Sequence, residues 1–188
     1  MAKLEAVVLE ANPQLAEVFS KVEASRGWVS NLMRTVAHTP QGLQHYSRLG
    51  HYARYDTDLT EIQRELSVVT TVRGVQYGWV HHCGLARQLG ITSGQLAEIE
   101  AGRVPADLPV SEQALVRFVL AFASFKGVPQ ATLDALREHF SARQIVDISL
   151  ISAYYLAAGA IITGFGVELE GPEILQIELD WQSSRMAG

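Results

Sequence analysis

Apolar residues recur at intervals of three and four along most of this chain, the spacing that buries one face of an α-helix. The clearest run places Leu59, Ile62, Leu66, Val69 and Val72 on one face. Further helical segments lie at about 39–53, 75–89, 92–101, 111–126, 129–140 and 141–163, with shorter ones at 15–22 and 29–36. No strand-like alternation of useful length and no internal repeat interrupts them. The pattern predicts an all-α fold, a bundle of about seven or eight helices.

Polar residues and glycines mark the ends of these segments. Gly90 lies one residue beyond its helix, where a left-handed C-cap is favoured. Helix starts are predicted at Thr39-Pro40, at Asp58 with Glu61, at Thr92 with Gln95, at Ser111, and at Ser141 with Gln144. Residues 1–37 form an N-terminal arm, which we expect to wrap the domain or a neighbouring subunit. The C-terminal tail, 171–188, is acidic with Trp181 as its one large anchor, and is predicted to be an arm or frayed.

Composition narrows the functional classes. The 188 residues are 48% hydrophobic and 19% charged, with a net charge of −5 and no basic run, so a nucleic-acid partner is not expected. A single cysteine excludes an intramolecular disulfide, and no secretory signal is visible, which favours a cytoplasmic protein. The uncharged stretch 148–167 is interpreted as a fully buried helix, in the core or at a subunit contact, with a membrane span as the alternative.

The segment 76–90 gathers most of the candidate chemistry. On a helix His82 shares its face with Gly78, Trp79, Leu85 and Ala86, and the two small residues leave room for a ligand or for another helix. His82 is either a general acid/base in an apolar pocket or a core histidine bonded to a backbone carbonyl.

The residues around His82 allow several interpretations. Cys83 is a small buried hydrophobe, a reactive thiol or a subunit contact, the first being favoured because adjacent helical residues diverge. For the same reason the His81-His82 pair is not expected to bind a metal. The last apolar segment contains the adjacent pair Tyr154-Tyr155. Tyr154 is the candidate that brings a hydroxyl into the pocket, and a core aromatic is the alternative.

Several fragments, in order, resemble the carboxymuconolactone decarboxylase and alkylhydroperoxidase D-like family. Arg64-Glu65-Leu66 matches the family's Arg-Glu-Leu, and Tyr77 to His82 is similar to its Tyr-Glu-Trp-x-x-His. Ala86 and Gly90 fall at its His-x3-Ala-x3-Gly spacing, and 91–99, 133–140 and 144–167 resemble its later helices. The resemblance covers about residues 38–170, which we therefore predict to be the helical domain. It implies an all-α homo-oligomer (dimer, trimer or hexamer) and Glu65 as the partner of His82.

Position 78 departs from both branches of that family. The redox branch uses Cys-x-x-Cys-x-x-x-His, and its cysteine positions are occupied here by Val75 and Gly78. The other branch has its glutamate at the position of Gly78. A dithiol peroxidase is therefore not expected.

The resulting functional prediction is a decarboxylase-like lyase or isomerase without cofactor. His82 and Glu65 would be catalytic, acting by proton transfer on a small carboxylated or cyclic organic molecule. Tyr77, Gly78, Trp79, Cys83, Ala86 and Tyr154 would form the substrate pocket. A peroxide-reducing antioxidant protein and a non-catalytic ligand-binding protein are the alternatives.

Overall fold

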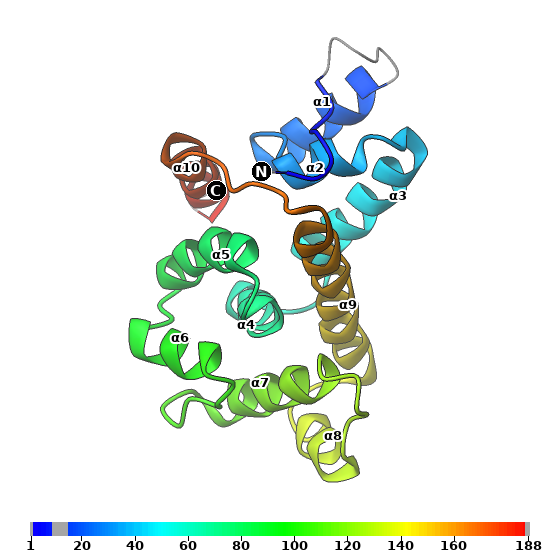
Figure 1. Cartoon of the computed structure of the whole chain (residues 1–188). Helices are drawn as coiled ribbons and strands as arrows, with labels where there is room; N and C mark the ends of the chain where they lie inside the picture. Colours follow the sequence, from blue (N-terminus) through cyan, green and yellow to red (C-terminus); the bar gives the residue numbers. More distant parts are fainter. Residues whose placement is uncertain (1, 9–14, 187–188) are drawn as a thin grey trace. The chain divides into compact units, whose positions relative to one another are not determined.

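The computed structural model describes residues 2–8 and 15–186 and is all-helical in those ranges (Figure 1). Ten α-helices are found there, more than the seven or eight predicted, together with a π-helix at Tyr52–Asp56. The short segments predicted at 15–22 and 29–36 are helical, and the main addition is a helix at Pro172–Met186, in the predicted C-terminal tail. Residues 9–14 of the predicted arm lie outside the described residues.

The chain divides into two compact units, Met1–His51 with Ala160–Gly188, and Tyr52–Gly159. The domain boundaries predicted from the sequence, after residues 37 and 170, stay a prediction.

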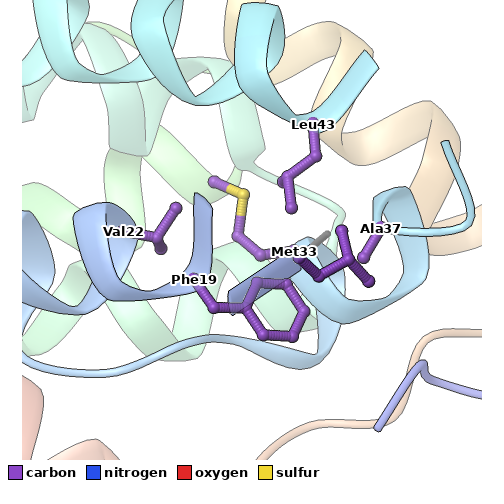
Figure 2. Packing of buried hydrophobic residues seen from close by; sticks show 6 residues of the cluster. Phe19, Val22, Met33, Ala37 and Leu43 are labelled. Atoms are coloured by element: carbon purple, nitrogen blue, oxygen red, sulfur yellow. The ribbon is translucent and has the colours of Figure 1, made fainter. Parts of the chain in front are cut away.

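The first unit contains α1 (Leu15–Arg26), α2 (Asn31–Val36), α3 (Pro40–His51) and α10 (Pro172–Met186). Figure 2 shows its core, where Phe19, Val22, Met33 and Leu43 from three helices pack together with Ala37. α10 corrects the prediction of an arm or frayed end. Its anchor Trp181 lies against Gly27, where an added Cβ would come within 2.8 Å of the indole. Gly27 also has a φ of +81°, so a glycine both turns the chain and admits the indole.

The second unit is built around α4 (Glu61–Val72), whose residues from Glu65 to Val72 are all buried. It packs against α5 (Gln76–Gln88) and α7 (Val110–Phe122) (Figure 1). α6 (Ser93–Glu100), α8 (Gln130–Arg137) and the part of α9 (Ala142–Phe165) up to Gly159 complete the unit.

Two predicted helix starts are wrong. Thr60, not Asp58, is the N-cap of α4, with Gln63 completing the capping box, and Asp58 instead pairs with Arg143 at 3.0 Å. α7 begins at Val110, so Ser111 lies inside the helix, where its hydroxyl donates to Glu112. In both cases a neighbouring residue starts the helix and the predicted cap bonds elsewhere. The start of α6 at Thr92, the left-handed Gly90 and the Ser141–Gln144 box before α9 are confirmed.

α9 is the one described helix that is long and apolar enough to cross a membrane by length and composition. Half of its most apolar window is buried within the protein, as expected of a core helix in a folded domain. Within one chain the stretch 148–167 is not fully buried, since Phe165 is 42% exposed. Burial of its exposed face at a subunit contact stays a prediction.

Candidate active site

Glu65 is fixed by the local structure of α4. The Thr60 hydroxyl accepts from the Gln63 backbone N–H, and the Gln63 amide oxygen accepts from the Thr60 backbone N–H, so the first turn is capped in both directions. Glu65 follows one turn later on a face that is otherwise buried. A carboxylate in that position has little access to water and needs a partner within the protein.

His82 supplies that partner from α5. The Nδ1 atom of His82 lies 2.7 Å from Oε1 of Glu65, and the two side chains are only 7% and 11% exposed. The prediction that placed Glu65 near His82 rested on the resemblance alone, and the two groups are indeed in hydrogen-bond contact.

Two glycines let α5 fold back closely on α4. Gly74, with a φ of +87°, makes the turn between the helices. At Gly78 an added Cβ would lie 2.9 Å from Cβ of Val72, closer than real side chains approach. The space beside Gly78 is thus filled by another helix and not left for a ligand, which corrects the assignment of Gly78 to a substrate pocket.

The pairing leaves the two imidazole nitrogens with different roles. An ionised carboxylate only accepts hydrogen bonds, so Nδ1 of His82 carries the proton it donates to Glu65. In the neutral ring Nε2 then has the free lone pair, the atom that takes up a proton in acid/base chemistry.

Aromatic side chains border the pair. The ring of Tyr155, on α9, stands edge-on to the His82 ring, with centroids 4.9 Å apart and planes at 89°. Tyr154, the tyrosine predicted for the site, packs instead on Tyr155 at 5.2 Å. Gly159 lies one turn further along α9. A Cβ added to it would be 3.2 Å from the side chain of Val75, just before α5, so the two helices approach closely there. Sequence reasoning noted both tyrosines, but the choice between neighbours depends on the rotation of α9.

The other predicted pocket residues are spread around α5. Tyr77 is buried against His81, not His82, with ring centroids 4.6 Å apart. Ala86 is fully buried and Trp79 is partly buried. Tyr77 therefore belongs to the face of α5 next to that of His82.

Cys83 has the character of a small buried hydrophobe. It is 6% exposed, and burial raises the pKa of its thiol to about 11, against a smaller opposing effect of Arg87. A thiol with that pKa is almost entirely protonated near neutral pH, whereas the nucleophile in thiol chemistry is the thiolate.

Arg64, adjacent to Glu65, is already engaged. Its Nη1 donates to the carbonyl of Leu59 at 2.5 Å, and Nη2 lies 3.7 Å from Glu61. Burial lowers the pKa of its guanidinium. These contacts give Arg64 a structural role at the start of α4. Within the described residues, no group of three or more His, Cys, Asp or Glu is arranged to hold a metal ion.

Comparison with known proteins identifies the fold. No family model matches the sequence, and no curated protein matches it at a significant level. Solved structures do match. One is an uncharacterised peroxidase-related protein with an alkylhydroperoxidase AhpD core from Ralstonia eutropha JMP134, with a TM-score of 0.77 and 23% identity over 95% of this chain and 96% of that one.

Two further structures agree. A peroxidase-related protein from Silicibacter sp. TM1040 has a TM-score of 0.74 and 18% identity over 89% of this chain and 92% of its own. A cysteine-to-alanine variant of the debrominase Bmp8, in complex with 2,3,4-tribromopyrrole, has a TM-score of 0.75 and 16% identity over 94% and 96%. At such identities the likeness defines the architecture and leaves the reaction open. The protein therefore has the all-α, alkylhydroperoxidase D-like fold.

Proposed function

We propose that this protein is an enzyme of the decarboxylase-like branch of that family, a lyase or isomerase that moves a proton with His82. The observation that carries the proposal is the buried 2.7 Å contact between Glu65 and Nδ1 of His82. A buried carboxylate that orients an imidazole is the arrangement that general acid/base catalysis uses.

In the proposed reaction Nε2 of His82 takes a proton from the substrate, and the ring becomes an imidazolium stabilised by Glu65. The same proton then returns to another substrate atom, either after a carbon–carbon or carbon–oxygen bond breaks or after a double bond shifts. The base ends each cycle in its starting state. This chemistry needs no cofactor, since one base both removes and returns the proton.

A small carboxylated or cyclic organic molecule is the proposed substrate class. Tyr155 beside the His82 ring offers an aromatic edge against which a planar molecule can pack. The fold neighbour Bmp8 was solved with 2,3,4-tribromopyrrole, a small cyclic molecule, which supports this choice.

The peroxidase alternative has less support. The chain has one cysteine, with its pKa raised to about 11, and Val75 and Gly78 occupy the positions of the family's thiol pair. Hydroperoxide turnover that is present in the wild type and lost in Cys83→Ser would favour this alternative.

We also propose that the protein is a cytoplasmic homo-oligomer. The exposed face of α9 supports the homo-oligomer, because the helix has no charged residue from Ile148 to its C-terminal end. Light scattering coupled to size exclusion measures the mass, and a mass near 20.6 kDa at all concentrations would contradict this part of the proposal.

The proposed reaction is tested by incubating the wild type, His82→Ala and Glu65→Gln with a metabolite extract and comparing all metabolites. His45→Ala, an exposed histidine of α3, is the matched control. We expect a compound that the wild type and His45→Ala consume, and that His82→Ala consumes about 10² to 10⁴ times more slowly. Equal consumption by His82→Ala would remove His82 from catalysis. An extract left unchanged by the wild type would favour the non-catalytic alternative.

A further inference from the structure

A hollow in the first unit carries polar chemistry that the proposed reaction does not use. It is an open hollow of about 280 Å³ between α1 and α3 and is lined by residues of these two helices. α1 contributes Glu17, Val18, Lys21 and Val22, and α3 contributes Gln44, Ser47, Arg48 and His51. On each helix these positions are three or four residues apart, so each helix presents one continuous face to the hollow.

The charges around the hollow sum to a positive excess. Lys21 and Glu17 neutralise each other through a 2.6 Å ion pair, and the pKa of Glu17 is lowered by this lysine. Arg48 is exposed, and no carboxylate lies within ion-pair distance of it among the described residues. The guanidinium is therefore available to an anion in a protein whose net charge is −5.

The rest of the lining is apolar or can donate hydrogen bonds. Val22 is buried in the core of the unit, and Val18 packs against that core, so together they give the hollow a hydrophobic floor. The side-chain amide of Gln44 adds N–H donors at the rim. An anion alone would leave the partly exposed Val18 in contact with water, whereas an anion with an apolar body would cover it.

We propose that this hollow binds a small organic carboxylate. The carboxylate would pair with the fork of Arg48, which matches its two oxygens, and the apolar body would lie over Val18 and Val22. The volume is close to the lower end of ligand pockets, about 300 Å³, so the ligand has the size of a single substituted ring. This inference does not depend on the proposed reaction at His82, which belongs to the other unit.

Benzoate is a suitable probe, with benzyl alcohol as its uncharged counterpart. We would titrate each into the ¹⁵N-labelled full chain and follow the backbone amides by NMR. Benzoate is expected to cause saturable shifts at amides of α1 and α3, and benzyl alcohol is not. Arg48→Gln should weaken the binding of benzoate about tenfold or more. Arg117→Gln, which removes an exposed arginine of α7, should leave it unchanged.

The proposal is overturned if the shifts do not saturate, if benzyl alcohol gives the same shifts, or if both arginine variants bind benzoate equally. Inorganic phosphate is the last arm of the experiment. Phosphate that binds at these amides more tightly than benzoate would show that the apolar floor plays no part, and would overturn the assignment to an organic carboxylate. A spectrum of Arg48→Gln that retains the wild-type dispersion confirms that the variant is folded.

Discussion

Removal of the Glu65 carboxylate is the perturbation whose cost the structure defines best. In Glu65→Ala the Nδ1–H group of His82 loses its acceptor inside the protein, because both side chains are about nine-tenths buried. A buried donor without an acceptor costs about 1–3 kcal/mol, and each buried methylene lost adds about 0.8 kcal/mol. We therefore expect Glu65→Ala to lower the free energy of unfolding by about 3 kcal/mol. Glu65→Gln keeps the shape and one acceptor oxygen, and should cost about 1 kcal/mol.

Thermal unfolding followed by circular dichroism measures this difference. In a chain of this length about 1 kcal/mol corresponds to 2–4 °C, so Glu65→Ala should lower Tm by about 6–12 °C. Glu98→Ala is the matched control, since Glu98 also meets its partner, Arg103, at 2.7 Å but in an exposed pair. Water replaces Arg103 there, and Tm should barely change. Equal shifts in Glu65→Ala and Glu98→Ala would show that Glu65 and His82 are not a buried pair.

Gly78→Ala should destabilise the protein by about 1–2 kcal/mol in urea unfolding, because the clash with Val72 outweighs the gain in helix propensity. Gly164→Ala, with open space at the new Cβ, should be neutral or stabilising, and the opposite order would refute the packing described. Thr60→Ala removes the α4 cap and should cost about 1 kcal/mol in the same assay. Alkylation of Cys83 should be very slow at pH 7, with about one thiol in 10⁴ ionised, and should accelerate up to about pH 11; fast labelling at pH 7 would contradict the raised pKa.

Much of the fold follows from local sequence signals. Helical spacing, the Ser141–Gln144 capping box and the glycine after α5 are each decided within a few residues, and the structure confirms them. The caps predicted at Asp58 and Ser111 fail because more than one nearby residue can cap a helix. Asp58 pairs with Arg143, which is remote in the sequence, and no local pattern reveals that competition. The contact of Trp181 with Gly27 likewise joins residues remote in the sequence, and no local pattern reveals it.

The sequence predicts which residue types form the candidate active site better than it predicts how they pack. The histidine, the glutamate and the tyrosine pair can all be named from the sequence, with Glu65 indicated by the family resemblance. Two features of the packing depend on how the helices are rotated and spaced. Val72 packs against Gly78, and Tyr155, not Tyr154, faces His82. Those features are tertiary, and a helical period specifies a face only to within about one residue.

The central claim is that Glu65 holds the proton of His82 on Nδ1 and leaves Nε2 for chemistry. Two-bond ¹H–¹⁵N correlation spectra of the imidazole rings identify which nitrogen carries the proton, and His82→Ala assigns the His82 signals among the six histidines. We predict that, at a pH where the ring is neutral, Nδ1 of His82 is protonated in the wild type, and that this preference is lost in Glu65→Ala. A neutral His82 protonated on Nε2 in the wild type would contradict the account.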